Sequence, residues 1–200
     1  ADAVLRRSPR PPLLVGPSGS GRTLLAKHLA AILHQPVYYL SATRYEDEDG
    51  LRADLSVIAR HNGVAILDDL DRIGGDGPPP VLGALAKAWS SGQPPIVAIA
   101  SPEGQARLAA WAPGLTAALD LVGLQPLEGE ELRAAVAAAA PAVLAQHGLS
   151  LGPGARLVEL VRLADLFLGG LAQPGRSLDL LDLACARTIR EGRAAVARET

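Results

Sequence analysis

The stretch GPSGSGRT, Gly16–Thr23, constrains this chain more than any other, and it follows the apolar run LLV. Its spacing is G-x-x-x-x-G-[KR]-[ST], with a further glycine at Gly19. Glycines let backbone N–H groups converge on a phosphate, and a helix that begins just after them directs its positive end to the same place. The motif therefore predicts a phosphate-binding loop between a strand and a helix. A merely glycine-rich turn is the alternative.

Each position of this loop has an expected role in binding a nucleotide. The hydroxyl of Thr23 is expected to hold Mg²⁺, and Arg22 stands where a lysine normally reaches the β- and γ-phosphates. The planar guanidinium is bulkier than an ammonium and prefers bidentate contacts, so we expect Arg22 to contact phosphate with a different placement. The predicted nucleotide-binding residues of the loop are Gly16, Pro17, Ser18, Gly19, Ser20, Gly21, Arg22, Thr23 and Leu24.

A second motif, VAILDDLD, begins at Val64. An aspartate at the carboxyl end of a buried strand beside the phosphate strand is the position that holds Mg²⁺ in P-loop enzymes, and Asp68 fits it. The next acid, Asp69, is the candidate catalytic residue that would orient the attacking water. An aspartate is one methylene shorter than the glutamate usual there, and this chemistry depends on position.

The first 125 residues alternate short apolar runs with helical patterns, which is typical of parallel strands joined by crossover helices. We expect residues 1–125 to form an α/β nucleotide-binding subdomain whose sheet is flanked by helices. The predicted strands are 12–16, 37–40, 64–68, 96–100 and 118–123, and the predicted helices are 23–33, 51–60, 81–89 and 103–111.

After Gln125 the strand pattern stops, and residues 126–200 are expected to form a small all-helical lid. Helical patterns begin near Glu128, where Pro141 is expected to kink or split the helix, and cover 155–168 and 177–190. Ser177 with Asp179 is a plausible cap for the last helix. The segment 74–80, GGDGPPP, reads as a surface loop.

Composition excludes several classes of protein. The chain is 48% hydrophobic and 20% charged with a net charge of −2, and without a basic stripe it gives no argument for nucleic acid as a partner. No apolar run reaches the ~18 residues of a membrane span. The single cysteine, Cys185, excludes a disulfide framework within this sequence and favours a buried small side chain in a reducing, cytoplasmic compartment. Because the sequence opens ADAVLRR without a methionine, we expect a piece of a longer protein.

The order of phosphate loop, acid-ended strand and helical lid resembles an AAA+ ATPase module. The stretches AKAWSSGQPPIVAIASPEG and ADLFLGGLAQPGRSLDLLDLACA resemble the first ATPase domain of Clp-type unfoldases and disaggregases, whose lid pattern is close to LPDKAIDLID. The resemblance implies a P-loop NTPase fold that binds ATP or ADP with Mg²⁺ between subdomain and lid. It also implies ring assembly with partner AAA+ subunits, and a protein substrate. In the lid, Arg176 stands where the family often has a lysine that faces the phosphates.

At several catalytic positions this sequence departs from the residues that the family carries. Besides Arg22 and Asp69, the place of the arginine finger reads Thr116, Ala117, Ala118, with no cation, and the fourth strand ends in Ala100 or Ser101 rather than Thr or Asn. A missing finger costs ~10³–10⁵ in rate. We therefore expect nucleotide binding to survive and hydrolysis to be slow. The alternative is a non-hydrolysing pseudo-ATPase that acts as a structural or regulatory ring member.

Tyr45 lies in ATRYEDEDGL, roughly where Clp-type rings carry an aromatic on a pore loop. An ordinary solvated acidic loop, Glu46–Asp49, is the interpretation we favour. These acids lack the alternation and the glycine that a calcium loop needs. The four histidines show no metal-ligand spacing.

Overall fold

The computed structural model describes residues 10–70, 81–152, 155–192 and 195–196. The chain divides into two compact units. The first holds residues up to Gly16 and Arg22–Leu124, and the second holds Pro17–Gly21 and the chain from Gln125 onward. Most of the phosphate loop thus groups with the second unit. The subdomain boundary near residue 125 stays a prediction. The segment 74–80 lies outside the described residues.

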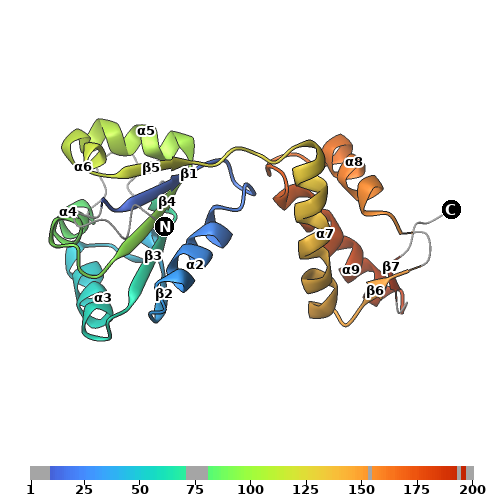
Figure 1. The fold of residues 1–200 in the computed structure, drawn as a ribbon, viewed down its shortest axis with the longest axis horizontal. Helices are drawn as coiled ribbons and strands as arrows, with labels where there is room; N and C mark the ends of the chain where they lie inside the picture. The colour runs from blue at the N-terminus through green and yellow to red at the C-terminus, as the bar shows by residue number, and fades with distance from the viewer. Residues whose placement is uncertain (1–9, 71–80, 153–154, 193–194, 197–200) are drawn as a thin grey trace. The chain divides into compact units, whose positions relative to one another are not determined.

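A five-stranded parallel sheet forms the centre of the first unit, in the order β2-β3-β4-β1-β5 (Figure 1). The strands are β1 Pro12–Val15, β2 Val37–Ser41, β3 Val64–Asp68, β4 Ile96–Ala100 and β5 Asp120–Gly123. The apolar runs of β3 and β4 are continuous because these strands are buried on both faces. All the strand predictions are confirmed, and the last begins two residues later than expected.

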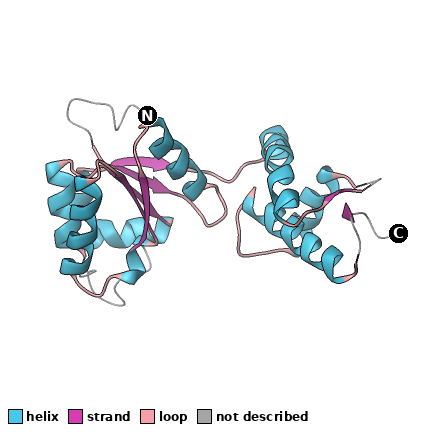
Figure 2. Ribbon diagram, turned by 90° about the horizontal axis from the view of Figure 1, so that it is seen from below, coloured by secondary structure: helices cyan, strands magenta, loops and turns pink. Residues whose placement is uncertain are grey.

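Helices cover both faces of this sheet (Figure 2). Helix α2 packs its small residues Ala26 and Ala30 on one face, against Leu14 and Ile66. The other face packs against helices α3, α4 and α5 around Leu13 and Leu67. Among its described residues, the helices are α2 Arg22–Ile32, η1 Ala42–Arg44, α3 Glu48–Arg60, α4 Leu82–Ser91, α5 Pro102–Trp111 and α6 Pro113–Ala117.

In the described part of the second unit, three helices pack on one another, with Leu144, Leu181 and Cys185 in their shared core. Cys185 is the buried small side chain that the sequence predicts. The lid is helical as expected, and it also has a two-residue parallel pair that no sequence pattern indicated. The elements are α7 Gly129–Gln146, β6 Ser150–Leu151, α8 Leu157–Phe167, α9 Gly175–Arg190 and β7 Ala195–Val196.

Two details of the lid differ from the prediction. Helix α7 is one continuous helix with Pro141 inside it, so of the two effects expected of this proline, a kink or a split, the split is wrong. Its buried residues Val136, Ala140 and Leu144 recur at a spacing of four and flank the proline, and this packing stabilises the helix across the lost backbone bond. Ser177 is not a cap, because α9 begins two residues earlier and the Ser177 hydroxyl donates to Gln173 at 2.8 Å.

Candidate nucleotide and metal site

The loop predicted to bind phosphate lies after β1 and leads into α2, as its spacing requires. Gly19 and Gly21 have φ values of +90° and +88°, a backbone conformation that glycine adopts without steric cost. The N–H of Ser20 donates to the carbonyl of Pro17 at 3.2 Å and closes the turn. Because α2 starts at Arg22, its first N–H groups have no partner within the helix and form a positive end at the loop.

Two side chains of the loop carry buried polar atoms without a hydrogen-bond partner. Four such atoms occur among the residues that the structure describes, and two of them are Ser20 Oγ and Arg22 Nη1. An unpaired buried donor costs about 1–3 kcal/mol. Their grouping at a helix N-terminus indicates that an anion is the missing partner, since both atoms can donate to phosphate oxygens.

Backbone hydrogen bonds join the loop to the lid segment before α9. The N–H of Ala172 donates to the carbonyl of Ser18 at 2.7 Å, and the N–H of Gly175 donates to the carbonyl of Gly19 at 2.9 Å. These bonds use loop carbonyls and leave loop N–H groups to other partners. The lid segment therefore contributes to the shape of the loop, which nothing in the loop sequence indicated.

Thr23 and Asp68, the two predicted magnesium ligands, lie together although they are 45 residues apart in the chain. The Thr23 hydroxyl donates to Asp68 Oδ2 at 3.0 Å. A hydroxyl beside a carboxylate is a donor set that suits Mg²⁺, which keeps several waters and needs only one or two carboxylates from the protein. No cluster of three or more His, Cys, Asp or Glu that could hold a metal occurs among the described residues.

Tyr39 reaches the same aspartate, and no sequence pattern had indicated it. Its hydroxyl also donates to Asp68 Oδ2. Partial burial, and then this hydrogen bond, raise the pKa of Tyr39 to about 12. The strand order explains the contact, because β2 is the neighbour of β3 and Tyr39 is paired with Ile66, two residues before Asp68.

Asp69, the candidate catalytic acid, has an unusual backbone. Its φ is +58°, and its N–H donates to Asp68 Oδ1 at 2.8 Å. The hydroxyl of Ser41, at the end of β2, donates to Asp69 Oδ2 at 3.0 Å. Ser41 is a second residue that sequence reasoning missed, although β2 and β3 end side by side with Ser41 opposite Asp68. Asp69 is thus held by a hydroxyl in this structure.

The end of β4 contributes no polar side chain to the group around Thr23 and Asp68. Ala100 is the last strand residue and is buried, and Ser101 follows it as the N-cap of α5. The Ser101 hydroxyl accepts the N–H of Gly104 at 3.0 Å. The polar candidate of this strand end is therefore engaged in capping a helix.

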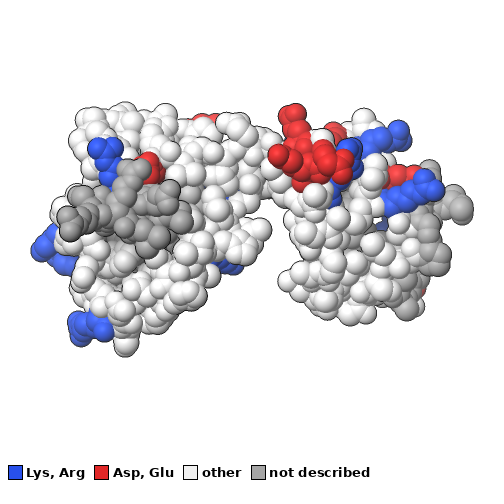
Figure 3. Space-filling model, viewed as in Figure 1, with Lys and Arg blue, Asp and Glu red and all other residues white. Residues whose placement is uncertain are grey.

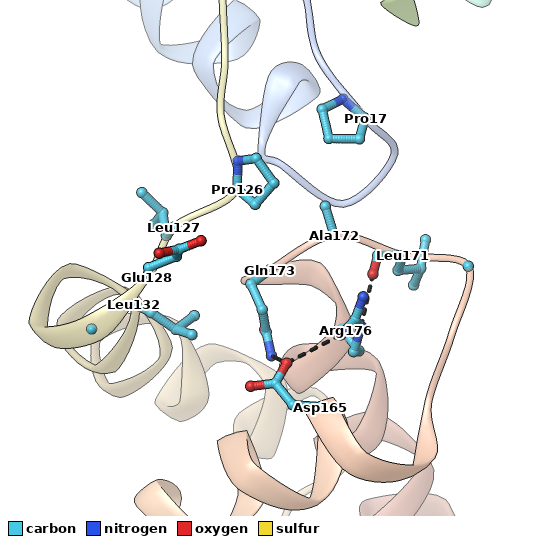
Figure 4. A pocket seen from close by; sticks show the side chains of 12 residues that line it. Pro17, Pro126, Leu127, Glu128, Leu132, Asp165, Leu171, Ala172, Gln173 and Arg176 are labelled. Carbon is cyan, nitrogen blue, oxygen red and sulfur yellow. Dashed lines mark hydrogen bonds and ion pairs between the residues drawn. The ribbon is translucent and has the colours of Figure 1, made fainter.

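A pocket of about 630 Å³ lies in the second unit, next to Pro17 of the loop (Figure 4). This volume is within the range of small-molecule sites. Its lining is mixed, since Leu127 and Leu132 are apolar while Glu128, Asp165 and Arg176 are charged. The complete lining is Pro17, Pro126, Leu127, Glu128, Gly129, Leu132, Asp165, Gly170, Leu171, Ala172, Gln173 and Arg176.

Arg176 forms part of the wall of this pocket. Its Nε donates to the carbonyl of Leu171 at 2.8 Å, and its Nη1 pairs with Asp165 at 3.1 Å. Asp165 also accepts a hydrogen bond from Gln173 at 2.9 Å. The predicted cation is therefore present beside a pocket, and it is bonded to the lid itself.

Tyr45 does not have the position that a pore-gripping aromatic requires. It is 8% exposed, belongs to the core cluster of the first unit, and its hydroxyl donates to Asp54 at 2.7 Å. The pore-loop interpretation is therefore wrong for this tyrosine. The neighbouring acids begin α3, where Asp47 is the N-cap and accepts the N–H of Gly50.

Charged side chains give no sign of a nucleic-acid surface on the face drawn in Figure 3. The Lys and Arg side chains of the first unit lie apart from one another there, and those of the second unit lie beside acidic ones. None of the described helices is long and apolar enough to cross a membrane.

Comparisons with known proteins agree with this geometry. Residues 12–101 match the model of the AAA family, ATPases associated with various cellular activities. The ATP-dependent clpX-like chaperone of Saccharomyces cerevisiae mitochondria is 36% identical over 74 residues, which cover 30% of this chain and 14% of that protein.

Solved structures of Hsp104 resemble nearly the whole chain. Hsp104 with ATPγS and casein in a closed state gives a TM-score of 0.76 at 20% identity, covering 98% of this chain and 37% of that one. The S. cerevisiae Hsp104–ADP complex gives 0.75 at 21% identity, with 93% and 29% covered. Our chain thus spans well under half the length of these relatives.

The parallel sheet with a glycine-rich loop between β1 and α2 defines a P-loop NTPase fold. Within that class, residues 12–101 match the AAA family model, and the fold of the chain is similar to that of the solved Hsp104 structures.

Proposed function

We propose that this chain is the ATP-binding AAA+ module of a Clp-like protein-remodelling machine, with slow or impaired ATP hydrolysis. The observation that carries the proposal is the hydrogen bond from Thr23 to Asp68 at 3.0 Å, which joins the two predicted magnesium ligands. Thr23 and Asp68 would hold Mg²⁺, Asp69 would orient water, and the loop would hold the phosphates of ATP or ADP.

Phosphate binding is supported by the unpaired atoms of the loop. Ser20 Oγ and Arg22 Nη1 are buried donors that a phosphate oxygen would satisfy, and the N-terminus of α2 adds its dipole. The remaining loop residues, from Gly16 to Leu24, would contribute through backbone N–H groups. When bound, Mg²⁺ neutralises charge on the β- and γ-phosphate oxygens.

The pocket of the second unit has a lining that suits the base of a nucleotide. Leu127 and Leu132 offer an apolar surface to an aromatic ring, and Pro17 connects this pocket to the loop. Arg176 would serve as the lid cation, provided that it exchanges its bond to Asp165 for one to phosphate.

Three features of the catalytic groups support slow hydrolysis. Arg22 replaces the lysine that reaches the transferred phosphate, and Asp69 is short and held by Ser41. The place of the arginine finger, Thr116–Ala118, carries no cation, and Thr116 is itself buried.

A non-hydrolysing pseudo-ATPase that serves as a structural or regulatory ring subunit is the second candidate. The missing finger favours it, since a ring made of this chain alone would have no finger at any site. Assembly would then need a different AAA+ subunit as partner, with a protein as the substrate of the whole machine. Nucleic-acid and membrane partners have no support, and a cytoplasmic location stays a prediction from the lone cysteine. A stable, ATPase-active homohexamer in light scattering would contradict this candidate.

Calorimetric titration of MgATP into the purified chain tests the proposal, with Arg22→Lys measured alongside. Arg60→Ala, which removes an exposed arginine at the end of α3, is the matched control. Micromolar binding by the native chain supports an ATP-binding module, and a turnover assay on both proteins then measures hydrolysis. We expect Arg22→Lys to hydrolyse ATP faster than the native chain, and we expect Arg60→Ala to hydrolyse ATP at the native rate.

Two other results separate the candidates. Binding by Arg22→Lys alone means that the loop is architectural in the native chain. If neither protein binds nucleotide, the ATP-binding proposal is wrong, and the structural subunit is the remaining function.

A further inference from the structure

Tyr39 lies on β2, the edge strand next to β3, and its hydroxyl reaches Asp68, which together with Thr23 forms the proposed magnesium site, here called the metal corner. The ring lies 5.7 Å from Lys27 Nζ, a distance at which a cation attracts an aromatic face. The hydroxyl at the far end of the ring donates to Asp68 Oδ2. Tyr39 thus contacts Lys27 through the face of its ring and Asp68 through its hydroxyl.

Asp68 already accepts three hydrogen bonds in this arrangement. Oδ2 accepts from Thr23 and from Tyr39, while Oδ1 accepts the backbone N–H of Asp69. A carboxylate offers about four acceptor positions, so only one is left for a further donor. A metal held through water needs its bound waters to donate to this same carboxylate.

We propose that Tyr39 is a positioning residue of the metal corner: its hydroxyl holds Asp68 in a metal-free arrangement and competes with metal-bound water for Asp68 Oδ2. The inference rests on the proposed function only in taking Thr23 and Asp68 as ligands of a divalent cation, and it concerns binding of that cation with or without nucleotide. The hydroxyl must leave Oδ2 for a second metal-bound water to reach the aspartate, and Tyr39 therefore lowers the affinity of the corner for Mg²⁺.

Packing alone does not account for the tyrosine. Tyr39 is 47% exposed, whereas its neighbour Tyr38 packs against the core on the opposite face of the sheet. A phenylalanine at position 39 would keep the ring beside Lys27 and would lose only the hydroxyl. The hydrogen bond to Asp68 is thus a contact that requires the hydroxyl of a tyrosine there.

Direct measurement of metal binding tests the inference. Mn²⁺ alone is titrated into the full chain, and free Mn²⁺ is counted by its electron paramagnetic resonance signal. We expect Tyr39→Phe to bind Mn²⁺ about tenfold more tightly than the native chain, since a hydrogen bond to a charged group no longer has to break. Tyr38→Phe removes a hydroxyl from the same strand and is expected to match the native chain.

A merely structural role would predict equal or weaker Mn²⁺ binding in Tyr39→Phe, and that result overturns the inference. So does the absence of saturable Mn²⁺ binding in both the native chain and Tyr39→Phe. ATP binding in EDTA, measured by calorimetry on the same samples, tests the proposed function separately. No ATP binding together with a tighter Mn²⁺ site in Tyr39→Phe would reject the nucleotide proposal and uphold the role of Tyr39.

Discussion

Gly19 and Gly175 are in backbone contact. A methyl group on Gly175 would lie 2.5 Å from the Cα of Gly19, and one on Gly19 would lie 2.6 Å from the carbonyl oxygen of Ala172. Two backbone hydrogen bonds run through the same contact, from Ala172 to Ser18 and from Gly175 to Gly19. The phosphate loop and the start of α9 therefore pack without side chains between them.

Gly175→Ala is expected to destabilise this contact by about 1–3 kcal/mol, because backbone atoms cannot yield as a flexible side chain can. Chemical denaturation with helical circular dichroism measures the change. Gly169→Ala is the matched control, since a methyl group there meets no atom within 4 Å. Equal stabilities of the two variants would show that the contact is loose in solution.

The backbone of Asp69 gives a second prediction. At φ +58° an asparagine fits nearly as well as an aspartate, whereas a β-branched residue is strained. Asp69→Asn should therefore change the free energy of unfolding by less than ~0.5 kcal/mol, and Asp69→Val should lower it by about 1–3 kcal/mol. Urea unfolding measures both. Asp120→Val, in the extended conformation of β5, controls for the loss of charge and is expected to be tolerated; a loss there as large as at position 69 would refute the strain argument.

Tyr45 makes stability depend on alkaline pH. Burial, and then the hydrogen bond to Asp54, raise the pKa of its phenol well above 10. The folded state thus keeps a proton that the unfolded state releases from about pH 10 upward, so this stabilisation is complete below pH 10 and falls as the pH rises. Thermal unfolding between pH 9 and 12 should show a smaller loss of stability for Tyr45→Phe than for the native chain. Parallel curves for the two proteins would mean that other groups cause the alkaline loss.

Arg176 gives a fourth prediction. Its bonds to Leu171 and Asp165 link the segment before α9 to α8, so Arg176→Met should lower stability by about 1 kcal/mol and weaken MgATP binding several-fold. Arg133→Met, which breaks an exposed pair with Glu130, should change neither quantity measurably. Calorimetry and thermal unfolding give both readouts. Unchanged nucleotide affinity in Arg176→Met would confine this arginine to a structural role.

The sheet could be predicted from sequence because its strands are short apolar runs with clear ends. The metal corner could be predicted in part for the same reason: Thr23 and Asp68 each lie at a motif-defined position, and parallel strands bring such ends to one edge. Ser41 and Tyr39 were missed because their role depends on which strand neighbours β3. Strand order is a tertiary property that spacing along the chain does not contain.

Other errors have local causes. A proline usually ends a helix, but α7 continues through Pro141 because buried residues on both sides of it pack against the rest of the lid. Ser177 looked like a cap because serine is common there, yet it is fully buried and bonded to Gln173. An acidic sequence around Tyr45 suggested exposure, whereas the aromatic side chain itself is buried in the core.

The burial of Cys185 has a practical consequence for studying this chain. It is the only cysteine of the sequence, its side chain is enclosed by α7 and α9, and burial raises the pKa of its thiol. A thiol reagent can reach it only when the lid helices separate, so the rate of labelling reports how often the helical core opens. A cysteine introduced on the surface can meanwhile carry a fluorophore with little background from the native thiol. The labelling rate of Cys185 therefore measures how often the helices of the lid separate, and introduced surface cysteines can be labelled independently of it.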